Sequence, residues 1–597
     1  YVRSALRMYQ RLALRYADAA AEAEALNYVA TLPLSRDGLL SVTRRLPPDP
    51  AAYDRLWDAR AALTRLLERR HRDLLASRDE EARDLGRQLV EARQRLAFLL
   101  LHPARDAEEH RKEVEKRTEA KEGLERRLAR RLQLAPPRTD PGQVTPARLA
   151  ELLPADAAFI DLLHYTDTEY DPRTPGKKGE KRTPRYVAFV VRKGQPVARV
   201  ELNEAAPIDA ARDAWREAIT APRPDEAAER RAAAALARLV WKPLRDALPA
   251  DLKTVYLAAE GRLSQVPWGA LPGRKPDTVL LDDCSVCLVP HGHFLLECLE
   301  DRGAAARSGD TLLAYGGIDY AQGSEAAVRG GVARAPLLAD KKRVLWPPLP
   351  GTAREQRQVV ALAEKVLRDR PVVRSGRAAG TAQLLDDLPK ARYAHLATHG
   401  FFADPRFRSA LQVDPALFDY GGAGERRAGA RSPLVLSGLV LAGANRDGPD
   451  AAPDRGIVTG EALVGLPLEG LELAVLSACE TGLGEDGGGE GAYGLQRAFH
   501  VAGCRNVVAS LWKVDDGATQ ALMALFYRNL WEKKLDAAEA LRQAQLTLYR
   551  HPEAVEAAQK RGADFAESDL PKVQEKPRRS PAAHWAAFTF SGVRPAK

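Results

Sequence analysis

The hydrophobic pattern of the chain changes its period across a proline-rich segment at residues 135–146 (APPRTDPGQVTP). Before this segment, apolar residues recur at the three- and four-residue spacing of amphipathic helices. After it, short apolar runs typical of buried strands alternate with helical stretches. The segment therefore predicts a boundary between an α-helical region at residues 1–135 and an α/β region that occupies the rest of the chain.

The first 135 residues are expected to form helices that each bury one face. Leu6, Tyr9 and Leu12 follow helical spacing, and residues 106–131 are almost entirely charged, which predicts a long exposed helix. The region can be a spacer, the end of a helical repeat array or the dock for a regulatory protein partner. No internal repeat can be read from it. Because the chain starts at Tyr1 inside a helical pattern, we expect it to be the C-terminal part of a longer protein.

Strand-like and helical segments alternate through the α/β region. Residues 158–163, 186–191 and 254–258 predict strands, and the basic stretch at residues 171–184 predicts a surface loop. Helical segments follow between and after these strands. Such alternation predicts a mostly parallel sheet flanked by helices.

Composition excludes several other classes of protein. Of the 597 residues, 45% are hydrophobic and 29% are charged, which excludes collagen, a disordered polyampholyte and a small disulfide-stapled scaffold. The net charge of +9 comes from 90 Lys and Arg interleaved with 81 Asp and Glu, so nucleic acid is not the expected ligand. Five cysteines, an odd and sparse set, indicate a reducing compartment, and we expect a cytoplasmic protein. No apolar run or signal-peptide pattern predicts a membrane span or export.

Two apolar runs in the last third end in residues suited to nucleophilic catalysis. Residues 391–398 run into His399 and Gly400, and residues 471–478 run into Cys479. If both runs are parallel strands, each places a reactive side chain at its carboxyl end, where open α/β sheets build their sites. Imidazole can take the proton of a thiol near neutral pH, and the backbone N–H groups of Gly400 and Cys479 could stabilise an oxyanion. Taken alone, a His or Cys at a strand end is more often a packed core residue, and the two residues together with their glycines leave both interpretations open.

The sequence around these residues resembles the CHAT family of bacterial cysteine peptidases, which are relatives of caspases and separases. The resemblance rests on HLATHGFF (395–402), LSACETGLGEDGGGEGAYGLQRAFHVAGCRNVVASLWKVDD (476–516) and AEALRQAQL (538–546), and weaker matches extend it over residues 150–597. It implies a caspase-like α/β fold with His399 as general base and Cys479 as nucleophile. It also implies that the Gly400 and Cys479 amides form the oxyanion hole, and that no metal or organic cofactor is required.

The resemblance also bears on specificity. In the related separases, an Asp shortly after an equivalent Leu-Trp strand is expected to receive an Arg side chain. Here Asp516 stands at the matching step, directly after Asp515, which implies cleavage after a basic residue, Arg rather than Lys. The alternative is that Asp515 or Asp516 only caps the helix that begins near Gly517. Family members commonly carry tetratricopeptide repeats upstream, which would suit the helical first region.

The α/β region is too long for one caspase-like sheet. We therefore expect a non-catalytic caspase-like half at residues 150–310, packed on a catalytic half at residues 311–597. The expected activity is that of an endopeptidase acting on protein substrates and regulated by the helical region or by a partner. The alternative is a catalytically silent interaction scaffold with a peptidase-like fold.

Cys284, Cys287, His291 and His293 are candidate zinc ligands. The segment around the two cysteines has a strand-like pattern, and strand alternation would send them to opposite faces, so packed cysteines and surface histidines are favoured. Cys298 and Cys504 are expected in the core.

Two polar insertions separate the two catalytic runs, at residues 419–432 and 445–455. We expect surface loops, with substrate contact or self-processing as the alternative, because Arg426, Arg427 and Arg431 would suit a basic specificity. The glycine-rich stretches do not match a phosphate-binding loop, since none opens a helix after a strand with the required lysine.

Overall fold

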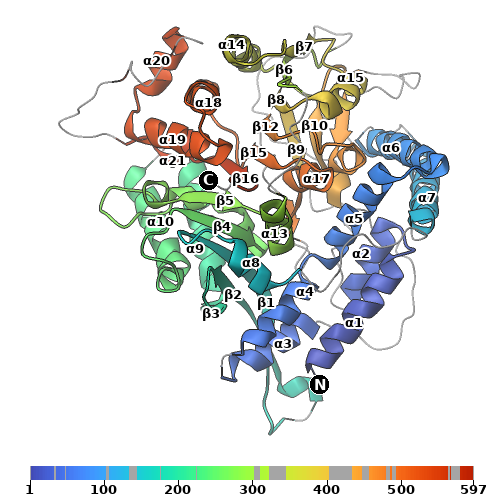
Figure 1. Ribbon diagram of the computed structural model, residues 1–597, viewed down its shortest axis with the longest axis vertical. Helices are drawn as coiled ribbons and strands as arrows, with labels where there is room; N and C mark the ends of the chain where they lie inside the picture. Colours follow the sequence, from blue (N-terminus) through green and yellow to red (C-terminus); the bar gives the residue numbers. More distant parts are fainter. Residues whose placement is uncertain are drawn as a thin grey trace.

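A computed structural model of the chain places helices and strands in one continuous assembly (Figure 1). It describes residues 2–31, 35–47, 49–101, 106–132, 144–174, 176–223, 225–301, 309–321, 345–402, 433–446, 456–478, 484–486, 492–561, 565, 570 and 579–595.

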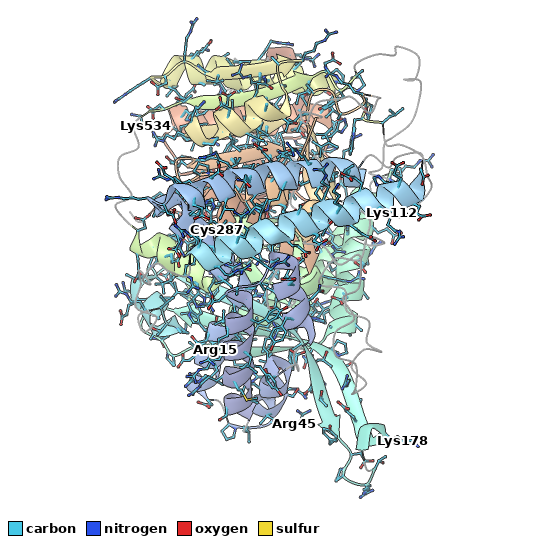
Figure 2. All side chains as sticks on the ribbon, turned by 90° about the vertical axis from the view of Figure 1, so that its right-hand side faces the viewer. Arg15, Arg45, Lys112, Lys178, Cys287 and Lys534 are labelled. Atoms are coloured by element: carbon cyan, nitrogen blue, oxygen red, sulfur yellow. The ribbon has the colours of Figure 1, made fainter. Side chains whose placement is uncertain are left out.

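The N-terminal region is helical, as predicted. The two longest helices pack against each other through an apolar seam that includes Leu85, Leu89 and Leu128, and their charged faces point outward (Figure 2). The helices are α1 (Val2–Ala17), α2 (Glu22–Thr31), α3 (Ser35–Arg44), α4 (Pro50–Ala59), α5 (Ala62–Ala76), α6 (Glu80–Leu101) and α7 (Ala107–Leu132).

The next segment begins the α/β region with five strands and six helices among the described residues. In the basic stretch predicted as a loop at residues 171–184, the described residues up to Gly179 lie outside the strands, as predicted, whereas residues 180–184 belong to β2. β1 and β2 pair without interruption from Ala158 with Arg192 to Tyr170 with Glu180. The resulting hairpin projects from the body, with Lys178 at its tip (Figure 2). The elements are α8 (Pro146–Leu152), β1 (Ala157–Tyr170), β2 (Glu180–Arg192), β3 (Ala198–Glu204), α9 (Ala205–Thr220), α10 (Glu226–Leu239), α11 (Trp241–Arg245), β4 (Thr254–Ala259), α12 (Leu280–Asp283), β5 (Ser285–Leu288) and α13 (Gly292–Glu300).

The remainder of the chain continues the alternation of strand and helix. Its central strands, β8 and β12, are buried at every residue, as expected for parallel strands covered on both faces. The elements are β6 (Leu312–Ile318), α14 (Pro350–Val366), β7 (Val372–Gly376), α15 (Thr381–Asp387), β8 (Tyr393–Ala397), β9 (His399–Phe402), β10 (Ser437–Val440), β11 (Ile457–Thr459), α16 (Gly460–Leu463), β12 (Leu473–Ser477), β13 (Gly484–Asp486), β14 (Ala492–Gly494), α17 (Leu495–Val501), β15 (Asn506–Ser510), α18 (Asp516–Tyr527), α19 (Ala537–Arg550), α20 (Ala554–Arg561), α21 (Ala582–Trp585) and β16 (Phe588–Ser591).

One eleven-stranded sheet runs through both parts of the α/β region, in the order β3-β2-β1-β4-β5-β16-β15-β12-β8-β6-β7. The antiparallel pairs are β1 with β2, β2 with β3, and β15 with β16, and the other described neighbours are parallel. The predicted mostly parallel sheet, flanked by helices and preceded by a helical region, is therefore confirmed. We call β3 to β5 the first half of the sheet and β16 to β7 the second half.

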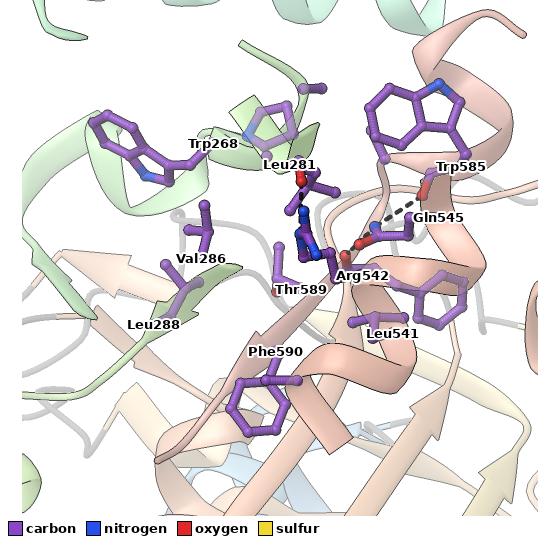
Figure 3. Close-up of a pocket in the computed structure, with 16 residues that line it drawn as sticks. Trp268, Leu281, Val286, Leu288, Leu541, Arg542, Gln545, Trp585, Thr589 and Phe590 are labelled. Atoms are coloured by element: carbon purple, nitrogen blue, oxygen red, sulfur yellow. Dashed lines mark hydrogen bonds between the residues drawn. The ribbon is translucent and has the colours of Figure 1, made fainter. Parts of the chain in front are cut away.

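The two halves meet edge to edge, whereas we expected one to pack on the other. Ser591 of β16 pairs with Leu288 of β5, and the Gly592 N–H donates to the Leu288 carbonyl at 2.8 Å. Trp268 and Leu281 face Trp585 across this junction and leave a cavity of only about 30 Å³ (Figure 3). The division of the chain into separately folding domains remains a prediction.

Helices cover both faces of the second half of the sheet. Apolar residues of α14, α18 and α19 share one core cluster, and residues of α5, α15, α16 and α17 share another. The N-terminal helices thus contribute to the core of the second half through α5. Among the helices that the structure describes, none combines the length and apolar character needed to cross a membrane.

Candidate active site

His399 lies just beyond the carboxyl end of β8, at the first residue of β9. β8 and β12 are parallel neighbours in which Ala397 pairs with Ser477. One residue further on, the Thr398 N–H donates to the Ser477 carbonyl at 3.3 Å. His399 is two residues beyond Ala397, and Cys479 is two residues beyond Ser477. The strands predicted to lead into the catalytic residues are therefore adjacent and in register.

A backbone carbonyl holds the imidazole of His399. Nε2 lies 2.7 Å from the carbonyl oxygen of Pro347, and the ring centroid lies 5.0 Å from that of Tyr320 and 5.4 Å from that of Trp346. Because a carbonyl only accepts, Nε2 of the neutral ring carries the hydrogen and Nδ1 keeps the lone pair. Nδ1 is therefore the nitrogen available as a base. Sequence reasoning could not find Pro347, since a backbone carbonyl leaves no residue-type signal.

The surroundings of His399 favour its neutral form. Burial lowers the pKa of His399 below its ordinary value of 6.5, and the positive charge of Lys513 lowers it further. The hydrogen bond to the Pro347 carbonyl acts in the opposite direction. The net shift is downward, so the proton-accepting form predominates at neutral pH.

Cys479 itself lies outside the described residues. The residue before it, Ala478, is buried, and its carbonyl accepts a hydrogen bond from Ser510 Oγ at 2.6 Å. Gly400 lies in β9 and pairs with Leu439 of β10. The backbone that leads to the predicted nucleophile and the glycine predicted for the oxyanion hole are thus both parts of regular, anchored strands.

The two aspartates after β15 have different surroundings. Asp515 Oδ1 accepts from two backbone N–H groups of the first turn of α18, at 2.9 and 3.1 Å, so Asp515 caps that helix. Asp516 is the first residue of α18, is exposed, and lies so near α14 that a Cβ on Gly351 would be 2.5 Å from its Oδ2. Partial desolvation, followed by the negative charges of Asp515 and Glu355, raises the pKa of Asp516. This carboxylate would gain from a cationic partner.

A buried polar group beneath β8 was not predicted. His395 is fully buried, with Nε2 3.2 Å from Glu355 Oε1 of α14 and Nδ1 3.1 Å from the Tyr527 hydroxyl of α18. The signal was present in the sequence, because both His395 and Glu355 lie inside segments that carry the family resemblance. The group ties the strand before His399 to α14, which lies against Asp516, and to α18, which begins at Asp516.

The candidate zinc ligands do not converge. His291 Nδ1 accepts from the Phe294 N–H and caps α13, and His293 stacks on Trp57 with ring centroids 4.4 Å apart. Cys284 and Cys287 are free, buried thiols. Within the described residues, these four side chains form no group compact enough to hold a metal. The packed interpretation is therefore favoured, although the histidines are buried and not at the surface.

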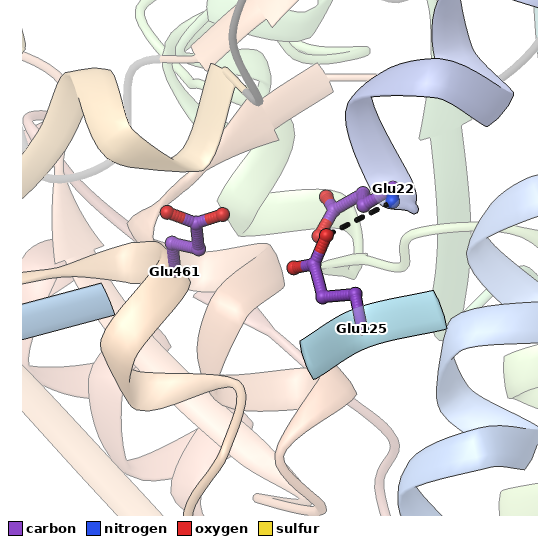
Figure 4. Close-up of side chains that lie close together, drawn as sticks. All are labelled: Glu22, Glu125 and Glu461. Atoms are coloured by element: carbon purple, nitrogen blue, oxygen red, sulfur yellow. Dashed lines mark hydrogen bonds between the residues drawn. The ribbon is translucent and has the colours of Figure 1, made fainter. Parts of the chain in front are cut away.

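A compact acidic group among the described residues is formed by Glu22, Glu125 and Glu461, from α2, α7 and α16 (Figure 4). Two buried cations offset part of its negative charge. Lys121 Nζ lies 2.6 Å from Glu461 Oε1, and an Arg93 terminal nitrogen lies 3.0 Å from Glu125 Oε1. We interpret the five residues as a structural ion cluster between the N-terminal helices and the second half of the sheet.

Most of the polar insertions, with Arg426, Arg427 and Arg431, lie outside the described residues. At the start of the second insertion, Asn445 and Arg446 are described and lie close to the site.

A family model described as the CHAT domain matches residues 230–593. No curated protein matches the chain. Among solved structures, it is similar to the Arg-specific cysteine proteinase gingipain R, with 10% identity over 63% of this chain and 69% of that chain and a TM-score of 0.30.

It is also similar to separase in the Saccharomyces cerevisiae separase–securin complex, with 9% identity over 96% of this chain and a TM-score of 0.37. This chain spans only 41% of that one. Both structural likenesses are distant, and the assignment rests on the family model. Because that model matches more than half of the 597 residues, the chain belongs to the CHAT domain family.

Proposed function

We propose that the protein is a cysteine endopeptidase in which Cys479 is the nucleophile and His399 the general base. The register of β8 and β12 carries the proposal, since Ala397 pairs with Ser477 and each reactive residue follows two positions later. Covalent geometry keeps the Cα atom of Cys479 within about 7 Å of that of Ser477. Neighbouring strands are about 4.8 Å apart. His399 and Cys479 thus follow neighbouring strand ends, and we propose that the imidazole and the thiol meet there.

The proposed reaction has two stages. Nδ1 of neutral His399 takes the thiol proton, and the Cys479 sulfur attacks the scissile carbonyl to give a tetrahedral intermediate. His399 then gives the proton to the leaving amine, which leaves an acyl-enzyme. Water, activated by His399, hydrolyses the thioester and restores the free thiol.

The backbone amides of Gly400 and Cys479 are proposed to stabilise the oxyanion. Two preorganised N–H donors in a partly buried site stabilise a developing negative charge more than they stabilise the neutral carbonyl. The fixed strand position of Gly400 supports this role, because donors that need no reorganisation contribute most.

We propose that the substrate residue before the cleaved bond is basic, Arg rather than Lys, and that Asp516 binds it. The exposed carboxylate and its raised pKa support this, because a guanidinium would offset the repulsion from Asp515 and Glu355. Asp515 contributes its negative charge, while one of its oxygens is engaged by α18. A planar guanidinium can donate to a carboxylate through two N–H groups, which an ammonium group cannot match.

Regulation through the N-terminal helices is supported by where they pack. α6 contacts β11 and α16, and β11 belongs to the three-stranded sheet β11-β10-β9 that contains His399. α5 contacts α17, which follows the segment after Cys479. A protein partner that displaced these helices would change the support of the site. None of the four described cysteines forms a disulfide, which is consistent with the cytoplasmic location that we propose.

The alternative proposal is a silent scaffold that recruits partners through its helices. The buried ion cluster that joins α2, α6 and α7 to α16 is compatible with it, because a rigid platform needs such anchoring. The presence of both His399 and Cys479 favours the peptidase.

The test is hydrolysis of a peptide library with Arg, Lys or neutral residues before the scissile bond. Wild type is expected to cleave Arg peptides, and Cys479→Ala to lose nearly all turnover. Cys298→Ser, which alters another free thiol, serves as the matched control and should retain activity. Equal turnover by wild type and Cys479→Ala would refute the peptidase assignment, and an inert wild type would favour the scaffold.

A further inference from the structure

The side chain of Asn445 binds one backbone residue through both of its polar atoms. The Trp346 N–H donates to Asn445 Oδ1 at 2.8 Å, and Asn445 Nδ2 donates to the Trp346 carbonyl at 2.8 Å. The two residues are 99 positions apart in the sequence. The amide therefore takes the place that a paired strand would occupy, and it satisfies the donor and the acceptor of Trp346 together.

Asn445 also contacts Tyr320, the second aromatic residue that lies beside His399. Its own N–H donates to the Tyr320 carbonyl at 2.9 Å. The Tyr320 ring packs against the ring of His399, and the Tyr320 hydroxyl shares a 2.9 Å hydrogen bond with Thr398 Oγ1. One residue thus connects both aromatic neighbours of His399.

Fixing Trp346 fixes the carbonyl that holds His399. Trp346 precedes Pro347, so its own backbone is restricted by the proline ring, and the φ angle of Pro347 is confined near −65°. With the N–H and the carbonyl of Trp346 both held, little freedom remains for the Pro347 carbonyl one residue later. That carbonyl accepts from His399 Nε2 at 2.7 Å.

We propose that Asn445 is a positioning residue for His399, which it orients by clamping the Trp346–Pro347 segment whose carbonyl selects the Nε2–H tautomer. The inference rests on the proposed peptidase function, because it assigns His399 the role of base. Asn445 itself touches no reacting atom, and it acts through Pro347 and Tyr320.

A purely structural role and a positioning role differ in pH dependence. Among the residues that the structure describes, the titratable groups that face His399 are Lys513, from the segment before α18, and the phenol of Tyr320. The proposed function adds the thiol of Cys479. The Pro347 carbonyl raises the pKa of His399. Loss of the clamp should weaken that hydrogen bond and lower the pKa, so the acid limb of the pH–rate profile should move to lower pH while kcat falls.

The experiment compares Asn445→Leu with Asn506→Leu. Leucine is close to asparagine in size and adds no charge. Asn506 is a matched control, because its amide also bridges two backbone groups: Nδ2 donates to the Glu472 carbonyl at 3.0 Å, and Oδ1 accepts from the Val593 N–H at 3.1 Å. Asn506 begins β15, at the end of the sheet away from His399.

Asn445→Leu is expected to lower kcat by about 10–100-fold, since a displacement of about 1 Å at a catalytic group has effects of this size. KM should change little, and the acid limb should shift downward. Asn506→Leu should leave the acid limb in place. A wild-type kcat and acid limb in Asn445→Leu, or equal losses without a pH shift in both variants, would overturn the proposal.

A second measurement is independent of turnover and of the folding of either variant. ¹⁵N chemical shifts of the His399 imidazole, assigned by difference from His399→Gln, report its tautomer in the Cys479→Ala protein. The Nε2–H form is expected, and a dominant Nδ1–H form would overturn the proposal. If Cys479→Ala proves as active as wild type, the peptidase assignment fails, while the tautomer still tests the clamp.

Discussion

The two halves of the sheet differ in the partners that surround the polar side chains near the carboxyl ends of their parallel strands. In the first half, Asp161 of β1 and Glu260 after β4 are almost fully buried. Arg60 pairs with both, Arg36 lies 2.9 Å from Glu260, and the Tyr53 hydroxyl donates to Asp161 at 3.1 Å. These partners come from α3, α4 and the residue after α4, so the N-terminal helices neutralise this edge with fixed charges.

In the second half, the corresponding edge carries His399, which is held by a neutral carbonyl and two aromatic rings. No carboxylate within the described residues pairs with it. A buried charge that is fully paired has no capacity left for a substrate, whereas a neutral imidazole with one lone pair available can still take a proton. The same strand-end position is therefore structural in one half and suited to chemistry in the other.

The largest expected effect tests the structural half. Arg60→Met removes the cation shared by Asp161 and Glu260 and should cost about 3–5 kcal/mol of unfolding free energy, because two carboxylates are left buried with one fewer partner. Urea unfolding measures the loss. His399→Ala should cost far less stability while removing activity. If Arg60→Met loses less unfolding free energy than His399→Ala, the assignment of a structural role to the first half and a chemical role to the second is wrong.

Asp515, which caps α18, and Asp516, the first residue of that helix, show the same contrast between a carboxylate with a structural role and one that is available to a substrate. Asp516→Asn should lower kcat/KM for Arg peptides by about 10–100-fold, since a hydrogen bond to a charged group contributes about 1.5–3 kcal/mol. It should leave stability almost unchanged. Asp515→Ala should cost about 1 kcal/mol of unfolding free energy through loss of the helix cap, with a smaller effect on kcat/KM. Full Arg preference in Asp516→Asn would show that the basic side chain binds elsewhere.

The smallest expected effect concerns pH. Lys513 lowers the pKa of His399, so Lys513→Gln should raise that pKa toward 6.5. His399 then stays protonated to higher pH, and the acid limb of kcat/KM moves to higher pH. Lys253→Gln, a change of an exposed lysine in the first half, should leave the limb unmoved. If the acid limb of kcat/KM in Lys513→Gln stays in place or moves to lower pH, Lys513 does not lower the pKa of His399 as described.

The sequence predicted elements whose signal is local. The buried runs at residues 391–398 and 471–478 enclose β8 and β12, because parallel strands covered on both faces need continuous apolar residues. The cap formed by Asp515 was also foreseen, as the alternative to substrate binding, since Asp before a helix is a strong local signal.

Non-local features could not be predicted in this way. The edge-to-edge joining of the two halves places Ser591 beside Leu288 and packs side chains of both halves into one core cluster, and no local pattern specifies either arrangement. The contact of Lys121 with Glu461 crosses 340 positions, and neither residue stands out among many charged neighbours. The Pro347 carbonyl and the Asn445 clamp depend on backbone geometry, which residue identity does not reveal.

We propose that the second half of the sheet activates one particular cysteine, Cys479. A peptidyl-arginine chloromethyl ketone, followed by peptide mass spectrometry at neutral pH, tests it most directly. Burial raises the pKa of Cys284 and of Cys298 to about 12 and also raises that of Cys287, so these thiols should not react. We predict one label per chain, on Cys479, and none in His399→Ala. Labelling of another cysteine with loss of activity, or undiminished labelling of Cys479 in His399→Ala, would contradict the account.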